Sequence, residues 1–140
     1  MTRHRVARAV LAVGALALGA CTYYPSITEV GGIRIQPANG RVIRDGDQAV
    51  FYADLNNTGK FGDVLTRVET PVAGRAELVG PSGSPLGRLE VPGGVLVRFE
   101  PDGRRVVLSA LTRALEPGEV VIVTLVFEKS GAIGVVAAVE

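Results

Sequence analysis

The stretch Val120-Val-Ile-Val-Thr-Leu-Val-Phe-Glu128 decides the fold class of this chain. It is rich in β-branched residues, which favour strands. Successive side chains of a strand point to opposite faces of the sheet, and both faces are apolar over the first part of this run. The run therefore predicts a strand at the centre of the core. One face would carry Val121, Val123, Leu125 and Phe127, and the other would carry Ile122, Thr124, Val126 and Glu128.

Eight further runs of this kind lie along the chain, and turn-forming residues separate them at intervals of about 8 to 12 residues. Between two of these runs, Pro101-Asp102-Gly103 predicts a hairpin that joins residues 95–100 to 104–111. A helical pattern is not found here, except around residues 109–116. The runs predict an all-β sandwich or barrel. They span residues 33–36, 48–56, 64–69, 75–79, 86–91, 95–100, 104–111 and 133–139.

The N-terminal segment predicts export. A basic start with Arg3, Arg5 and Arg8 precedes an apolar run over residues 9–20. That run is too short to cross a bilayer, which needs about 20 apolar residues. A signal peptide over residues 1–20 is therefore a better interpretation than a transmembrane helix.

The end of this segment, Leu18-Gly19-Ala20-Cys21, resembles the lipobox of bacterial lipoproteins. The resemblance implies that Cys21, the only cysteine of the chain, is linked to diacylglycerol and becomes the first residue. The alternative is a plain secretory signal with a chance cysteine. We expect an extracytoplasmic protein that is lipid-anchored to the cell membrane. Residues 21–32 would be the tether, and 33–140 a single immunoglobulin-like domain.

The charge of the chain argues against nucleic-acid binding. The whole sequence has 15 Lys+Arg and 14 Asp+Glu. Removing the three arginines of the signal peptide leaves 12 cations against 14 anions, a net charge of −2. A nucleic-acid binder needs a basic face to neutralise phosphates, so we expect no nucleic-acid partner.

A series of short motifs runs through the predicted domain in a fixed order. Together they resemble the periplasmic copper chaperones of the PCuAC type, over roughly residues 33–139. The resemblance implies a small cupredoxin-like β-sandwich, which agrees with the predicted strands. The motifs are Tyr52-x-x-Leu55-x-Asn57-x-Gly59, Asp63-x-Leu65, PVAGRAEL at 71–78, LEVPGG at 89–94, PDG at 101–103, LSAL at 108–111, LEPG at 115–118 and LVFEKSG at 125–131.

The copper ligands that the resemblance implies are absent. The family binds Cu(I) through histidines and methionines, because imidazole and thioether are soft ligands. At the corresponding positions this chain has Val79, Pro81, Arg105 and Val107. Arg105 has no lone pair to donate. We therefore predict no metal site and no cofactor in the domain.

The overall composition leads to the same prediction. The only histidine is His4 and the only methionine is Met1, both within the signal peptide, and lipidation would consume the thiol of Cys21. Asp45 and Asp47 leave open a site for a hard cation such as calcium. Solvated turn carboxylates are the alternative reading of this pair.

Catalysis is not expected either, because general acid-base and nucleophilic mechanisms rely on histidine, cysteine or tuned lysines and carboxylates. One feature suggests binding instead: Arg98, Arg104 and Arg105 flank the predicted hairpin, with Arg88 nearby. Arginine forks suit carboxylates and phosphates, so this group could bind an envelope protein partner or anionic lipid headgroups. Alternatively, the charges keep edge strands soluble.

Three functions remain open from the sequence. The first is a membrane-anchored interaction module on the copper-chaperone scaffold that has lost its Cu(I) site. The second is a metallochaperone that uses ligands of a partner or an unrecognised site. The third is a structural envelope lipoprotein with an apolar cleft for a lipid or a small molecule.

Overall fold

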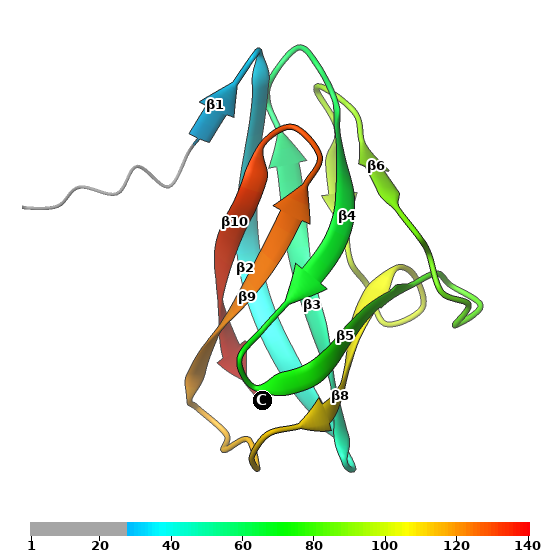
Figure 1. The fold of residues 1–140 in the computed structure, drawn as a ribbon, viewed down its shortest axis with the longest axis vertical. Coiled ribbons are helices and arrows are strands. Elements are labelled where there is room, and N and C mark those ends of the chain that lie inside the picture. The colour runs from blue at the N-terminus through cyan, green and yellow to red at the C-terminus, as the bar shows by residue number, and fades with distance from the viewer. Residues whose placement is uncertain (1–27) are drawn as a thin grey trace, which may run out of the picture.

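The part of the chain that the structure describes, residues 28–140 of a computed structural model, consists of β-strands and connecting turns (Figure 1). The predicted all-β class is therefore confirmed. These residues include no helix long and apolar enough to cross a membrane. The strands are β1 (Thr28–Val30), β2 (Ile33–Asp45), β3 (Gln48–Asn57), β4 (Asp63–Glu69), β5 (Ala73–Val79), β6 (Leu89–Val91), β7 (Leu96–Arg98), β8 (Arg105–Leu111), β9 (Val120–Phe127) and β10 (Gly131–Val139).

The strands form one sheet in the order β5-β8-β3-β2-β10-β9-β4-β6, which curls into two facing layers. One layer contains β2, β3 and β8, and the other contains β10, β9 and β4. The layers join where β10 runs parallel to β2 over two residue pairs, Ala138 with Arg41 and Val139 with Val42. The core lies between them, and Phe51 of β3 meets Phe99 edge to face with ring centroids 6.5 Å apart.

Strand β2 is much longer than the predicted run at residues 33–36. The turn-forming pair Asn39-Gly40 lies within β2, where the structure has a β-bulge with a register shift between Ala38 and Arg41. Asn39 adopts φ 54°, and its amide donates to Asp54 Oδ2 at 2.8 Å. A Cβ on Gly40 would lie 2.5 Å from the Val136 carbonyl oxygen. The bulge thus bends β2 and lets β10 approach it.

The predicted tether is too long at its C-terminal end. Residues 28–32 belong to the sheet, because β1 pairs antiparallel with the first residues of β2. Gly31 and Gly32 form the turn between the two strands with φ 56° and 83°. The predicted signal peptide at 1–20 and the rest of the predicted tether, 21–27, lie outside the described residues.

The predicted Pro101-Asp102-Gly103 hairpin is wrong. Strands β7 and β8 do not pair with each other, since both pair antiparallel with β3, one after the other along the same edge. The turn itself exists, because Gly103 N donates to the Glu100 carbonyl at 2.9 Å and Glu100 N to the Arg104 carbonyl at 3.0 Å. The local signal located the turn, but packing against β3 determined the strand partners.

Strand β9 lies in the middle of its layer, but it is not buried on both faces. Val121, Val123, Leu125 and Phe127 point into the core as predicted. On the opposite face, Val120 and Ile122 are 61% and 54% exposed. No described element covers this side of the layer, which the sequence pattern alone did not reveal.

Two polar side chains are buried among the described residues, and both belong to the sequence motifs. Asn57 uses all four hydrogen-bonding positions of its amide. The oxygen accepts from the backbone N–H groups of Arg34 and Gly59, and the nitrogen donates to the carbonyls of Phe61 and Val91. Asn57 therefore fastens the end of β3 to β2, β6 and the β3–β4 loop.

Asp63 is only 3% exposed and joins β4 to the β9–β10 turn. Its carboxylate accepts backbone N–H groups from Val64 at 2.8 Å, Lys129 at 2.9 Å and Ser130 at 2.8 Å. Burial opposes ionisation of this group, but the hydrogen bonds from Ser130, Val64 and Lys129 outweigh it and lower the pKa of Asp63. The carboxylate is thus charged and fully engaged in the fold.

Replacing Asp63 with asparagine should lower the free energy of unfolding at pH 7 by about 1–3 kcal/mol, because an amide cannot accept from all three N–H groups. Since the pKa of Asp63 is lowered by folding, its ionic contribution is complete above the ordinary value of about 3.9. It is lost as the pH falls through the lower pKa of the folded state. Urea unfolding of both proteins at pH 7 and in this acid range would measure the difference.

The difference in the free energy of unfolding between wild type and Asp63→Asn should become smaller at low pH. The control Asp45→Asn, at an exposed turn residue, should change the free energy of unfolding little at either pH. If the difference in the free energy of unfolding between wild type and Asp63→Asn stays constant with pH, the charge of Asp63 does not contribute as proposed.

Candidate functional site

The four positions where the PCuAC resemblance implies copper ligands lie close together in the structure. Antiparallel pairing of β5 and β8 places Val79 opposite Arg105, and Glu77 opposite Val107. Pro81 follows in the loop after β5. Val79 is 4% exposed and has no polar atom in its side chain. The pairing thus brings the positions together, but with aliphatic groups and one cation.

The guanidinium of Arg105 takes part in the internal hydrogen bonding of this region. Its Nη1 donates to the Gly80 carbonyl at 3.3 Å and to the Gly103 carbonyl at 3.1 Å. It therefore links the loop after β5 to the Pro101–Gly103 turn. The same loop is closed by Gly80 N donating to Ser84 O at 2.9 Å and Leu86 N donating to Leu78 O at 2.8 Å.

Asp45 and Asp47 are the other metal-binding group that the sequence suggests. Asp45 and Asp47 flank Gly46 at the exposed β2–β3 turn, where Asp45 pairs with Gln48 across the end of the hairpin. Within residues 28–140, no three side chains of His, Cys, Asp or Glu gather as a metal ion would require. The turn residues Asp45 and Asp47 are thus two carboxylates without a third donor of these types beside them.

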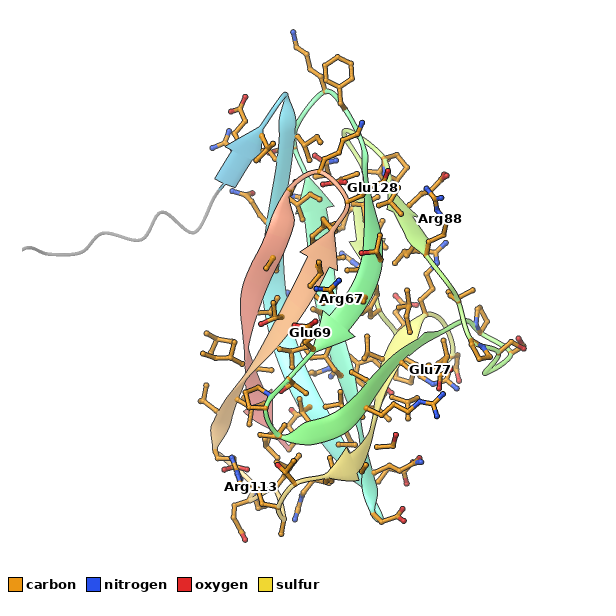
Figure 2. The ribbon with its side chains drawn as sticks, in the orientation of Figure 1. Arg67, Glu69, Glu77, Arg88, Arg113 and Glu128 are labelled. Carbon is orange, nitrogen blue, oxygen red and sulfur yellow. The ribbon has the colours of Figure 1, made fainter. Side chains whose placement is uncertain are left out.

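The structure separates the predicted arginine group into different roles. Arg98 and Arg104 are exposed, and neither forms an ion pair in the described part of the chain. Arg105 is partly buried by its two carbonyl contacts. Arg88 instead lies beside Glu128, with 3.7 Å between Nη2 and Oε2 (Figure 2). Arg98 and Arg104 remain as a predicted partner-binding pair.

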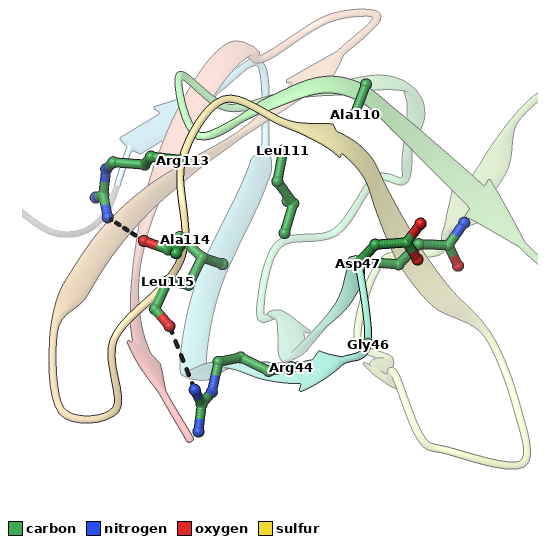
Figure 3. A pocket seen from close by; sticks show the side chains of 9 residues that line it. Arg44, Gly46, Asp47, Ala110, Leu111, Arg113, Ala114 and Leu115 are labelled. Atoms are coloured by element: carbon green, nitrogen blue, oxygen red, sulfur yellow. Dashed lines mark hydrogen bonds between the residues drawn. The ribbon is translucent and has the colours of Figure 1, made fainter.

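A cavity of about 820 Å³ opens at the other end of β8 from Arg105 (Figure 3). Arg44, Asp47 and Arg113 share its lining with apolar side chains such as Leu111 and Leu115. Arg44 Nη1 donates to the Leu115 carbonyl at 3.5 Å. The lining is mixed rather than apolar, so it differs from the cleft that the third hypothesis requires.

One of the two cations of this cavity, Arg113, is compensated by a carboxylate. Arg113 Nη1 lies 2.8 and 2.9 Å from the two carboxylate oxygens of Glu119. This hydrogen bond raises the pKa of Arg113 and lowers the pKa of Glu119, to which the Glu116 N–H also donates. The cavity holds no histidine or cysteine and has no free pair of carboxylates.

Cys21, the predicted lipidation site, lies outside the described residues. The sequence pattern missed the exposed apolar face of β9 and the structural roles of Asn57 and Asp63. The signal for the two polar residues was present, since both lie in the motifs. Their partners, however, come from segments distant in the sequence.

Solved PCuAC domains share this fold. The copper-bound PCuAC domain from PmoF2 is 23% identical, with a TM-score of 0.69 over 81% of this chain and 97% of that chain. The apo PCuAC domain from PmoF1 is 29% identical, with a TM-score of 0.68 over 81% and 98%. A Cu(I)-bound protein from Deinococcus radiodurans is 23% identical, with a TM-score of 0.66 over 91% and 85%. No curated protein matches the chain.

These similarities confirm the PCuAC-type, cupredoxin-like fold that the motifs implied. The family model described as "Putative lipoprotein LpqE-like" matches residues 28–139, nearly the whole described region. The chain therefore belongs to the LpqE-like family, built on a PCuAC-type β-sandwich.

Proposed function

We propose that the protein is a lipid-anchored extracytoplasmic interaction module on the PCuAC scaffold, with no Cu(I) site made by its own domain. The observation that carries this proposal is the contact of Arg105, which occupies a ligand position and donates to the carbonyls of Gly80 and Gly103. A fixed cation at this point repels a metal ion and offers it no lone pair.

The chemistry of the surrounding residues supports the loss of copper binding. After Cys21 the sequence contains no histidine, methionine or cysteine, so no soft side-chain ligand remains. The carbonyls of Gly80 and Gly103 beside this position already accept hydrogen bonds from Arg105. The fold can be similar to that of copper-bound domains although soft ligands are lacking, because residues such as Asn57 and Asp63, and not the implied ligand positions, hold the sandwich together.

Anchoring is supported by two independent features. The N-terminal segment has the charge, apolar run and cysteine of a lipoprotein signal. The description of the matching family also carries the word lipoprotein. Lipidation of Cys21 would remove the last thiol, so anchoring and the absence of a soft ligand depend on the same residue.

A binding role without catalysis is supported by the use of the polar groups. Asp63, the one buried carboxylate among residues 28–140, is occupied by three backbone N–H groups. By contrast, Arg98 and Arg104 project beside the Pro101–Gly103 turn without ion-pair partners in the described region. They suit an acidic protein partner in the envelope.

A second candidate is metal transfer within a complex in which the partner supplies the ligands. The similarity to the copper-bound domain of PmoF2 supports it. In that case Cu(I) would bind only when the partner is present, which separates this candidate from a metal site within the chain.

The lipidated protein in detergent should not take Cu(I) from a chelator of micromolar affinity, because its domain offers no thiolate, thioether or imidazole. Competitive titration with Cu(I) under anaerobic conditions measures this. The PCuAC domain of PmoF2, whose structure holds copper, is the positive control.

An unlipidated chain that keeps the Cys21 thiol is a second control, since one thiolate alone should bind Cu(I) more weakly than the full site of PmoF2. Binding of one Cu(I) per lipidated chain, tighter than micromolar, would contradict the proposal.

The double charge reversal Arg98→Glu/Arg104→Glu should weaken crosslinking to an acidic partner in native membranes several-fold, because both attractive charges become repulsive. Wild-type crosslinking should also decline as salt screens the exposed charges. The matched control, Lys60→Glu/Lys129→Glu, changes net charge equally at exposed residues outside the turn. Equal crosslinking by wild type and the Arg98→Glu/Arg104→Glu protein would remove these arginines from the interface.

A further inference from the structure

The outer side of β9 and β10, which we call the β9–β10 face, is a ladder of residues without any charge. Its cross-strand pairs lie side by side in the hairpin register. Ile122 stands directly opposite Val136, and these residues are 54% and 65% exposed. The pairs are Val120 with Ala138, Ile122 with Val136, Thr124 with Gly134 and Val126 with Ala132.

The β4 margin of this face carries one ion pair and two hydroxyl groups. Arg67 and Glu69 stand opposite Val126 and Thr124, and they neutralise each other through a contact of 2.7 Å between Nε and Oε1 (Figure 2). On the β4 side, the hydroxyl of Thr66 donates to the Val126 carbonyl at 3.0 Å and that of Thr70 to the Ile122 carbonyl at 2.8 Å. A surface that covers the face therefore does not need to supply hydrogen bonds at these positions. It needs only to shield the branched side chains from water.

The chain enters the domain on the same side as this face. Strand β1 pairs with the beginning of β2, and β10 pairs with β2 further along the same edge. Figure 1 shows β1 and β10 on one side of the molecule. From Cys21 to Thr28 the chain advances seven residues. Even fully extended, this segment spans at most about 25 Å.

We propose that the β9–β10 face rests on the lipid surface that holds the anchor, with Val120, Ile122 and Val136 at the level of the headgroups. This inference rests on the proposed lipidation of Cys21. The short connection keeps the domain close to the bilayer, so docking becomes an intramolecular event at high effective concentration. A small apolar contact is then sufficient.

A second copy of the chain is a less suitable occupant. Stable protein interfaces bury about 800 Å² on each partner, with polar groups around a hydrophobic centre. The β9–β10 face offers three largely exposed branched side chains and otherwise mostly small residues. Its lack of charge also implies that docking does not require anionic lipids.

Another group of exposed apolar residues lies at the β3–β4 and β6–β7 loops, with Phe61 60%, Val95 41% and Leu96 43% exposed. The ring of Phe61 packs against Gly32, where a Cβ would lie 2.8 Å from it. Phe61 thus has a role within the domain, and it neighbours the charged Lys60. The loops serve as the competing site in the test below.

Docking by the β9–β10 face also orients the rest of the domain. Strands β7 and β8 belong to the opposite layer, through their pairing with β3. Arg98 and Arg104 would therefore face away from the bilayer, where a protein partner can reach them.

A fluorophore that brightens in apolar surroundings can test this orientation, because lipidated Cys21 leaves an introduced cysteine as the only reactive thiol. The lipidated Val136→Cys protein is labelled and bound to phosphatidylcholine vesicles. Its fluorescence should be several-fold higher than that of the same labelled protein in solution without vesicles or detergent. Nitroxide-labelled lipid should quench it. Adding phosphatidylglycerol should change neither result, since the face carries no charge.

Labels at Asp102→Cys, in the opposite layer, and Val95→Cys, at the competing loops, should remain in water. When Ile122→Thr and Val136→Thr are also present, the fluorescence of a label at Val120→Cys should fall to that of the label at Asp102→Cys. Threonine retains the β-branched shape, so circular dichroism should show an unchanged fold. The domain should still float with the vesicles through its anchor.

The outcomes separate the orientation from the anchoring. If the protein floats with vesicles but the Val136→Cys label stays in water, the β9–β10 face does not dock. If nitroxide-labelled lipid instead quenches the fluorescence of the label at Val95→Cys, the β3–β4 and β6–β7 loops are the docking site. Brightening at Val136→Cys that depends on protein density, without lipid quenching, would show a second copy. If the parent chain labels at Cys21 and does not float, the lipid anchor itself is overturned, and the docking with it.

Discussion

The hydrogen bonding of the buried Asp63 carboxylate is the interaction on which much of this structure depends. An ionised group inside a protein is tolerated only when it is well bonded, and Asp63 receives N–H groups from both its own strand and the β9–β10 turn. This connects β4 to the hairpin that closes one layer over the core. Asn57 does the same for the opposite layer by linking β3 to β2 and to β6.

These two side chains show how residues of the PCuAC-type motifs can hold the fold independently of the positions where the resemblance implies copper ligands. Asn57 and Asp63 stabilise loops and turns, and Gly59 lies so close to the Gly32 carbonyl that a side chain would not fit. None of them lies at the positions of Val79 and Arg105. The residues that hold the sandwich together are therefore distinct from the residues that would hold a metal. A chain can keep the former while Arg105 joins two loops by hydrogen bonds.

The proposed functions are consistent with one orientation of the domain. The connection from Cys21 is short because β1 belongs to the sheet. In the proposed orientation it would bring the uncharged β9–β10 face towards the bilayer and leave the opposite layer, with Arg98 and Arg104, in the aqueous envelope. Apolar contact and charge recognition would thus act on opposite sides of the sandwich, where neither interferes with the other.

Much of the fold could be predicted because its signals are local. Residues 120–128 showed strand periodicity, Gly and Pro clusters marked most turns, and the motif order indicated the PCuAC-type sandwich. The errors concern pairing and coverage. Asn39-Gly40 became a bulge because β10 packs against it, and Pro101-Asp102-Gly103 joined two strands that both pair with β3. Residues 28–32 belong to the sheet through a backbone pairing that the pattern of their side chains did not predict.

The amino-acid sequence by itself determined the chemical inventory: strands rather than helices, one cysteine at Cys21, and no histidine or methionine after His4. No folding can supply a soft ligand that the domain does not contain. Only the tertiary structure decided which apolar face stays exposed, which arginine is engaged internally and which polar groups are buried together. These properties depend on contacts between segments far apart in the chain, and Val120 and Val121 differ in exposure only because one layer of the sandwich lies uncovered.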